Sequence, residues 1–176
     1  QYPGPHPVVA HPPCKRWGRY WSGGPSAKVR RNLGDDLGCF DRALWAVRTF
    51  GGVLEHPEAS KAWEWFGLTK PPRSGGWVAA DSIGGMTCCV EQGHYGHRAR
   101  KATWLYSLRI DYTMFAPTWG PSEGKVRMEP GFHSSAERAN ATEDQRRVKR
   151  LSAAERIATP IPFRDLLVAM ARSARL

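Results

Sequence analysis

Cys14 and Glu55 are the residues whose types and positions most directly suggest chemistry. Cys14 is followed at once by Lys15 and Arg16, and neighbouring cations lower the pKa of a thiol and favour its nucleophilic thiolate. A carboxyl group on a neighbouring strand could work with that thiolate as an acid or base. Taken singly, the plainer alternative is an inert buried cysteine and a surface or capping glutamate.

Short apolar runs place both residues at the ends of predicted strands. Residues 8–11 predict a strand that stops at the rigid Pro12-Pro13 turn, just before Cys14. Residues 53–55 predict the next strand, stopped by the His-Pro pair that follows. Ligands gather at the carboxyl ends of strands in open α/β sheets. The two residues are therefore expected to face a common pocket.

The rest of the pattern alternates helices and strands. Residues 37–50 predict a helix capped by Asp35 or Asp36 and ended by Gly51-Gly52, with its apolar face formed by Leu37, Phe40, Leu44 and Val47. The other expected elements are a short helix at 60–66, a loop at 71–85, strands at 86–91 and 102–110, a capping box at Ser152 and Glu155, and a helix at 162–172. This order predicts one α/β domain over residues 1–176, a sheet flanked by helices. Within it, the charged segment 133–150 is either mobile or a surface helix.

The charge favours a nucleic-acid partner over a merely basic protein. The chain has 26 Lys+Arg against 16 Asp+Glu, a formal charge of +10, and most of the cations are arginine. The candidate nucleic-acid contacts are Lys15, Arg16, Trp17, Arg19, Arg98, Arg100 and Lys101. A solvated turn is an equal alternative for the last three. Trp17 and Trp21 suit base stacking and packing equally well, whereas Trp45, Trp63, Trp65 and Trp104 are expected to fill the core.

Other classes are less compatible with the sequence. It has no apolar run long enough for a membrane span and no visible signal peptide. Four cysteines, two of them adjacent, fit a reducing cytoplasm better than a disulfide scaffold. The six histidines and four cysteines lack a Cys-x-x-Cys pair, so no metal is expected, and a zinc-dependent nuclease ranks third among the hypotheses.

An ordered set of motifs extends these observations. His11-Pro-Pro-Cys14 resembles the Pro-Cys motif of the DNA cytosine-5 methyltransferases, and Gly51-Gly-Val-Leu-Glu-His-Pro57 resembles their Glu-Asn motif, with His56 in place of Asn. Gln92-Gly-His-Tyr-Gly-His97 with Lys101-Ala-Thr-Trp-Leu-Tyr106 resembles a later segment of phage and prophage members. The tail, from Glu155 to the Phe-Arg-Asp-Leu-Leu run at 163–167, resembles the ending of the same group.

The resemblance implies a function for each candidate. It implies a partial Rossmann-like methyltransferase sheet, with Cys14 as the nucleophile that adds to C6 of a cytosine and Glu55 as the group that activates the ring at N3. It also implies a DNA partner, a base turned out of the duplex, and the cytoplasm of a bacterial or phage-infected cell.

The cofactor is where the sequence departs from that family. Its Gly-rich S-adenosylmethionine loop lies upstream of the Pro-Cys motif, and none of the thirteen residues before Cys14 forms one. The alternatives are a cofactor half that was lost, one supplied by a partner chain, or a non-catalytic nucleic-acid-binding relative. The target site, DNA against RNA, the group transferred, catalytic activity, N-terminal trimming and oligomeric state stay open.

Overall fold

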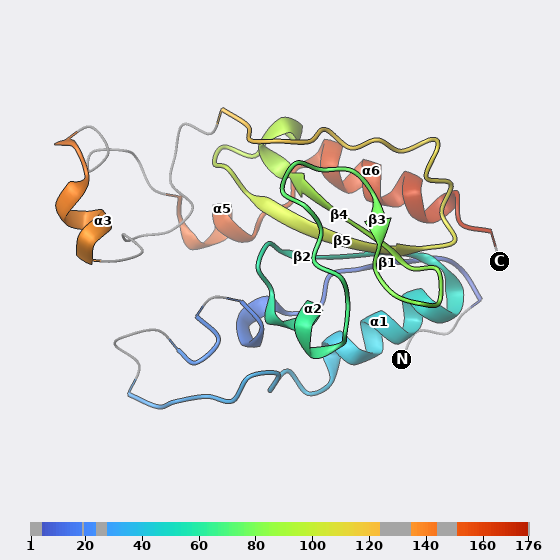
Figure 1. The fold of residues 1–176 in the computed structure, drawn as a ribbon, viewed down its shortest axis with the longest axis horizontal. Helices are drawn as coiled ribbons and strands as arrows, with labels where there is room; N and C mark the ends of the chain where they lie inside the picture. The colour runs from blue at the N-terminus through green and yellow to red at the C-terminus, as the bar shows by residue number, and fades with distance from the viewer. Residues whose placement is uncertain (1–4, 19, 24–27, 124–134, 144–150, 176) are drawn as a thin grey trace.

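The five strands that the structure describes form one open sheet in the order β1-β2-β5-β4-β3, flanked by helices (Figure 1). The computed structural model describes residues 5–18, 20–23, 28–123, 135–143 and 151–175. The strands are β1 (Val8–Ala10), β2 (Gly52–Pro57), β3 (Val78–Ala79), β4 (Met86–Glu91) and β5 (Ala102–Leu108). The helices are α1 (Cys39–Phe50), α2 (Lys61–Trp65), α3 (Ser135–Asn140), α5 (Ala153–Ile157) and α6 (Ile161–Arg172), with short 3₁₀ turns η1 (Cys14–Arg16) and η2 (Gln92–Tyr95).

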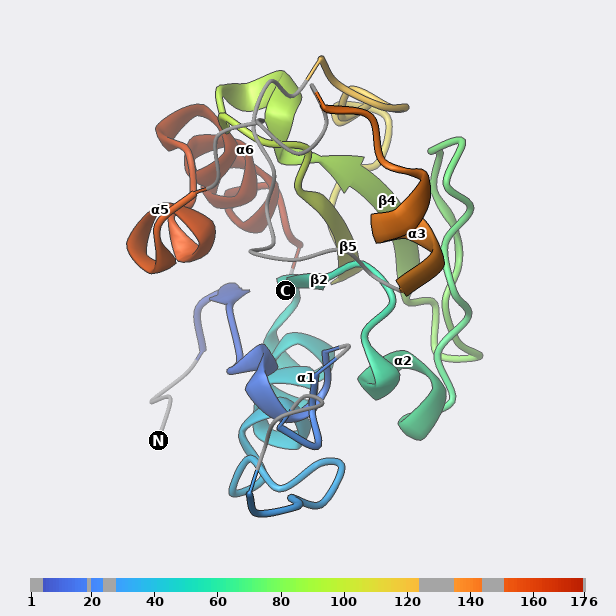
Figure 2. The ribbon, with the colours of Figure 1, turned by 90° about the vertical axis from the view of Figure 1, so that its left-hand side faces the viewer.

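The strand directions bring distant parts of the chain to one edge of the sheet. β1 pairs with β2 in parallel, whereas β5 runs antiparallel to both β2 and β4. The carboxyl ends of β1, β2 and β4 therefore meet the start of β5 at a single edge, which we call the carboxyl edge. Figure 2 looks at this side of the molecule, where α5 also lies.

Side-chain alternation along the strands divides the core into two layers. On one face, Leu54 and Tyr106 pack with α1 and the aromatic residues around α2. On the other face, Val53 and Leu105 pack with the buried side chains of α6. Figure 1 shows α6 on one side of the sheet and α1 and α2 on the other. The expected α/β sheet flanked by helices is thus confirmed at this level.

Helix α1 begins two residues later than its apolar pattern predicts. Phe40, Leu44 and Val47 are buried as expected, but Leu37 is 96% exposed and has a positive φ of 59°. Asp36 accepts a hydrogen bond from the backbone N–H of Phe40 at 2.9 Å, so it does satisfy a free amide at the helix start. Leu37 lies in the turn between this carboxylate and the helix and cannot join the helical face.

Strand β2 is longer than predicted at both ends. The expected stop at His56 is wrong, because His56 and Pro57 continue the ladder opposite Trp104 and Thr103 of β5. At the other end, Gly52 has a φ of 117°, and a Cβ there would lie 2.1 Å from the backbone oxygen of Val8 in β1. The absence of a side chain at Gly52 is what allows β1 and β2 to approach each other.

The remaining elements follow the sequence pattern closely. β4 has the predicted bounds, β5 ends two residues early at Leu108, and α6 begins one residue early at Ile161. The predicted capping box at Ser152 and Glu155 is present. The loop at 71–85 contains the two-residue strand β3. Of the charged segment at 133–150, residues 135–143 contain α3, which projects beyond the body on the side of the carboxyl edge (Figure 1); the rest lies outside the described residues.

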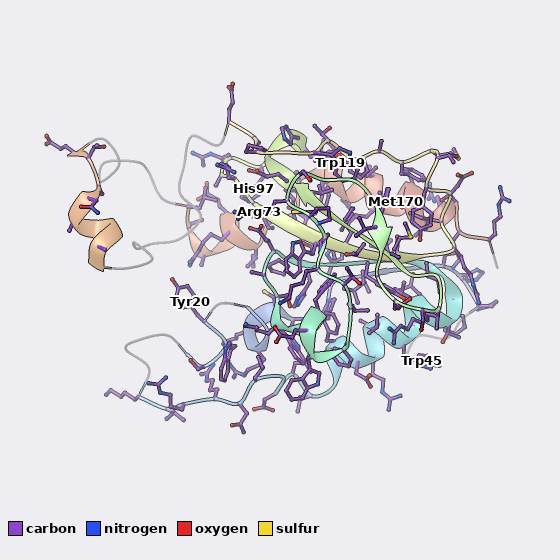
Figure 3. All side chains as sticks on the ribbon, viewed as in Figure 1. Tyr20, Trp45, Arg73, His97, Trp119 and Met170 are labelled. Atoms are coloured by element: carbon purple, nitrogen blue, oxygen red, sulfur yellow. The ribbon has the colours of Figure 1, made fainter. Side chains whose placement is uncertain are left out.

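The tryptophans divide between core and surface. Trp63 and Trp104 are buried as expected, but Trp45 and Trp65 are 51% and 61% exposed, so the core prediction is wrong for these two. Trp45 lies on the outer side of α1, away from the sheet (Figure 3). The periodicity of an amphipathic helix does not bury every aromatic residue on it, because only one face reaches the core.

Candidate functional site

Cys14 and Glu55 lie toward the carboxyl edge, although Glu55 is two residues before the end of β2 and not at the strand end that the sequence predicts. Cys14 begins η1, three residues beyond the His11 that follows β1, and is exposed. Glu55 is in β2, with its side chain 13% exposed. The two are close enough for the Glu55 carboxylate to raise the pKa of the Cys14 thiol. The parallel pairing of β1 and β2 produces this proximity.

The Glu55 carboxylate is held by two side chains from different segments. Nδ1 of His11 lies 2.9 Å from Glu55 Oε2, and Nε2 of Gln92 donates to Oε1 at 3.3 Å. Gln92 is fully buried at the end of β4 and also donates to Oγ1 of Thr103 at 2.9 Å. Gln92 therefore fixes Glu55 from inside the protein, while His11 covers it from the solvent side.

The environment of Cys14 does not lower its pKa, contrary to the sequence expectation. Although Cys14 is exposed as a residue, partial burial of its thiol and the negative charge of Glu55 raise the pKa of the thiol above its ordinary value; a backbone hydrogen bond and Lys101 partly oppose them. Lys15 and Arg16 follow Cys14 in sequence but are not among these causes. The resting form is therefore a thiol beside a carboxylate.

Lys101 supplies a positive charge to this site. It precedes β5, and its charge acts on both Cys14 and Glu55. Burial lowers the pKa of Lys101, whereas Glu55 and Cys14 raise it. Its Nζ also donates to the carbonyl oxygen of Ala158, just after α5, at 2.9 Å. Thiol, carboxylate and ammonium thus form one electrostatic cluster, which with Gln92 we call the carboxyl-edge cluster.

His56 is a buried histidine close to the loop that carries the thiol. Its side chain is 1% exposed, and Nδ1 lies 2.7 Å from Oγ of Ser60. Burial lowers its pKa to about 4, and Glu55 and the backbone of Pro13 and Pro12 act in the opposite direction. A neutral imidazole therefore lies close to the backbone of Pro12 and Pro13, in the turn that leads to Cys14.

The other candidates near Cys14 differ in accessibility. Lys15 is exposed and Arg16 is partly buried. Trp17 is 2% exposed, its indole N–H donates to Asp36 at 2.7 Å, and its ring packs on Phe40, so the structure favours packing over base stacking for this residue. Arg19 lies outside the described residues.

The basic loop before β5 is exposed but engaged in ion pairs. Arg98 pairs with Glu155 of α5, and Nε of Arg100 lies 3.3 Å from Oε1 of Glu91. Both side chains are more than half exposed. Arg98 can exchange its exposed pair for a phosphate at small cost, because exposed ion pairs contribute little. Arg100 is different, because the Glu91 side chain that it pairs with is only 6% exposed.

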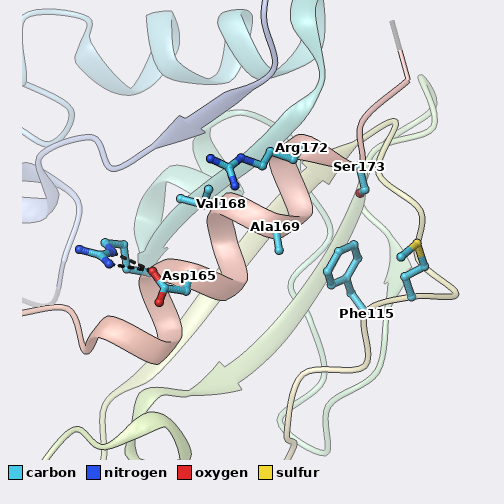
Figure 4. A pocket seen from close by; sticks show the side chains of 8 residues that line it. Phe115, Asp165, Val168, Ala169, Arg172 and Ser173 are labelled. Atoms are coloured by element: carbon cyan, nitrogen blue, oxygen red, sulfur yellow. Dashed lines mark hydrogen bonds and ion pairs between the residues drawn. The ribbon is translucent and has the colours of Figure 1, made fainter.

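Other features of the described residues do not coincide with this cluster. No group of three or more His, Cys, Asp or Glu side chains in the described ranges could hold a metal. A hollow of about 690 Å³ lies beside α6 and is lined in part by Phe115, Asp165 and Arg172 (Figure 4). Its lining includes neither Cys14 nor Glu55. None of the helices that the structure describes has the length and apolar character needed to span a membrane.

Sequence reasoning did not select Gln92 and His11 as site residues. Both occur in the quoted motifs, Gln92 at the start of Gln-Gly-His-Tyr-Gly-His and His11 at the start of His-Pro-Pro-Cys. Their signal was position, because Gln92 follows a predicted strand in the same way that Cys14 does. Comparison of the chain with protein-family models, curated proteins and solved structures gives no significant match.

Proposed function

We propose that this protein is a DNA cytosine-5 methyltransferase-like protein that acts on a pyrimidine base through Cys14 and Glu55. The observation that carries the proposal is the coupling of an exposed thiol, a held carboxylate and Lys101 at the ends of strands. A nucleophile beside an acid–base group is the arrangement that addition to an electron-poor ring requires. The positive charge of the chain supports a nucleic-acid substrate.

In the proposed step, Cys14 Sγ forms a bond to C6 of the ring. The C5=C6 π pair forms a C4=C5 double bond, the C4=N3 π pair moves onto N3, and N3 takes up a proton, which leaves C5 enamine-like. The S–H proton balances the proton gained at N3, and Glu55 is placed to relay it. Lys101 stabilises the thiolate as it forms, since its charge opposes the effects that raise the pKa of Cys14.

The methyl donor has no fitted site among the described residues. The segments after β1 and β2 have the sequences His-Pro-Pro and Glu-Ala-Ser, without glycine, so they do not fit S-adenosylmethionine in the Gly-rich loop that the resemblance implies. We therefore derive no transfer step, and the proposed chemistry is limited to addition at C6.

Covalent trapping on DNA that contains 5-azacytosine tests this step. The ring nitrogen at position 5 makes C6 more electrophilic and takes up the electron pair, so the adduct needs no methyl donor. We expect the native chain to gain the mass of the oligonucleotide, and Cys14→Ser to abolish the adduct. Cys39→Ser is the matched control, since Cys39 is also an exposed, free cysteine. Trapping that persists in Cys14→Ser, or is lost only in Cys39→Ser, would contradict the assignment.

Glu55→Gln separates the two proposed roles. The amide keeps the size of the side chain but cannot relay a proton, so trapping should slow by about 10²-fold or more. DNA affinity measured by fluorescence anisotropy should remain within a few-fold of the native value. Unchanged trapping would remove Glu55 from the mechanism while leaving Cys14 in place.

A second candidate, a non-catalytic nucleic-acid-binding protein, is favoured by one observation. The raised pKa of Cys14 leaves little thiolate at neutral pH in the absence of a substrate. If the protein only binds nucleic acid, we expect its DNA affinity to fall steeply with salt concentration. We also expect no adduct on 5-azacytosine DNA and no binding of S-adenosylmethionine by calorimetry. An adduct at Cys14 decides for the first candidate.

A further inference from the structure

Two isoleucines are exposed beside the carboxyl-edge cluster. Ile157 ends α5 and Ile161 begins α6, and they are 80% and 63% exposed. Residues 157–161 form the turn between these helices, which we call the α5–α6 corner. Single exposed apolar residues are common on protein surfaces, so the position of these two is what matters.

The corner is fastened to the basic loop that leads into β5. Lys101 Nζ donates to the carbonyl oxygen of Ala158 at 2.9 Å, and Arg98 pairs with Glu155. His97 Nε2 lies 3.3 Å from the carbonyl oxygen of Glu155. Because the charge of Lys101 also acts on Cys14 and Glu55, the corner borders the proposed base-binding site.

Caps and prolines fix the helix starts on either side of the corner, and several cations lie near it. A capping box fixes the start of α5, and a proline stands at the N-cap of α6 and another in its first turn. Arg156 and Arg164 lie within three residues of the isoleucines in sequence, and Arg98 and Lys101 contact Glu155 and Ala158 next to them. The acids beside them, Glu155 and Asp165, are already paired with Arg98 and Arg164.

We propose that Ile157 and Ile161 form an apolar wedge that packs against the base stack next to the target nucleotide of duplex DNA. This inference rests on the proposed function. A base that must reach Cys14 has to leave the stack, and the remaining bases then expose apolar faces. Aliphatic side chains can cover such faces, while nearby cations contact the phosphates. The two isoleucines and the cations around them provide this combination at the rim of the site.

The test compares duplex with single-stranded DNA in the double variant Ile157→Ser/Ile161→Ser. The probe is a random-sequence oligonucleotide pool with 5-azacytosine in place of cytosine, as duplex or as single strand. We expect trapping on the duplex to slow by about tenfold or more, and trapping on single strands by less than about threefold, since no base has to be extruded there. The matched control is Ile83→Ser, because Ile83 is 55% exposed in the turn between β3 and β4, at the opposite edge of the sheet. The control should change neither rate.

Two outcomes would overturn the wedge. One is an equal loss on both forms of DNA, or no loss on either. The other is a native chain that is dimeric by light scattering and becomes monomeric in the double variant, which would make a second copy of the chain the occupant of the corner.

A binding measurement on a variant that cannot form the adduct tests the wedge independently of the proposed function. Anisotropy with unmodified duplex is measured on Cys14→Ser with and without the two isoleucine substitutions. A selective loss of duplex affinity supports the wedge even if the native chain forms no adduct, whereas the missing adduct contradicts the proposed function alone. Unchanged duplex affinity together with unchanged trapping contradicts the wedge alone.

Discussion

Two polar clusters lie toward opposite ends of the same sheet, and they differ in how completely their hydrogen-bonding groups are satisfied. Away from the carboxyl edge, Asp81 accepts hydrogen bonds from Arg48, Tyr106 and the backbone amides of Ile83 and Gly85. Here one carboxylate has four donors, and we call this group the Asp81 cluster. In the carboxyl-edge cluster, Glu55 is held by Gln92 and His11, and an exposed thiol lies nearby.

The difference separates a structural role from a chemical one. The Asp81 cluster ties α1 to the β3–β4 turn and leaves its carboxylate fully satisfied, so it has no capacity for a ligand. In the carboxyl-edge cluster the Glu55 carboxylate raises the pKa of Cys14, and Oε1 of Gln92 is buried without a hydrogen-bond partner among the described residues. Incomplete satisfaction of this kind is typical of sites where a substrate completes the interactions.

The largest expected effect is a loss of stability on mutation of the Asp81 cluster. Asp81→Ala should lower the free energy of unfolding by about 2–4 kcal/mol, because it leaves a guanidinium, a hydroxyl and two amides without their acceptor. Urea unfolding followed by tryptophan fluorescence measures this loss. Cys14→Ser should change stability by less than about 0.5 kcal/mol, since the side chain is exposed. Similar losses at both positions would erase the distinction between the clusters.

The second prediction concerns pH and the buried His56. Its folded pKa of about 4 lies below the ordinary value of 6.5. Between these two pH values the imidazole is protonated in the unfolded chain and neutral in the folded chain. The resulting stabilisation is complete above pH 6.5 and is lost as the pH falls toward 4, by up to about 3 kcal/mol. His56→Asn should flatten the dependence of unfolding free energy on pH over this range. His94→Asn, at an exposed histidine, should keep the native slope. An unaltered slope in His56→Asn would show that other groups dominate.

The smallest expected effect is on the reactivity of the thiol itself. The carboxylate of Glu55 raises the pKa of Cys14 and Lys101 lowers it. At pH 8, Glu55→Gln should therefore speed alkylation of Cys14 by iodoacetamide, and Lys101→Met should slow it, each by about threefold to tenfold. Peptide mass spectrometry follows Cys14 and the reference thiol Cys39 in the same sample. Rate changes of the opposite sign would break the proposed electrostatic coupling.

Local patterns predicted the elements whose periodicity is set within a few residues. β4 and the capping box at Ser152 follow directly from the sequence, and α6 deviates by one residue. The prediction that Leu37 belongs to the apolar face of α1 was wrong, because Leu37 has a left-handed backbone conformation before the helix begins. The spacing of apolar residues does not reveal such a turn. β2 continues through His56 because its antiparallel partner comes from far along the chain. Pairing of that kind is a tertiary property.

For the site, the strand-end argument brought Cys14 and Glu55 together but not their neighbours. Gln92 and Lys101 join them because β5 pairs with β2 and β4 pairs with β5, so the residues after β4 and before β5 lie at the same edge as the end of β2. Strand order cannot be read from alternation. The pKa of Cys14 was mispredicted for the same reason. Adjacency in sequence pointed to Lys15 and Arg16, whereas the charges that act on the thiol come from β2 and from the residue before β5.

The missing side chain at Gly52 also affects where the Cys14 thiol lies relative to the Glu55 carboxylate. Gly52 lies opposite Val8, at the start of the strand that leads to Cys14. Because β1 spans only three residues, a methyl group at position 52 would displace the whole strand rather than bend it, and the turn beyond it would move as well. Gly52 therefore influences the distance between the Cys14 sulfur and the Glu55 carboxylate from the opposite end of the paired strands, although it contacts neither group.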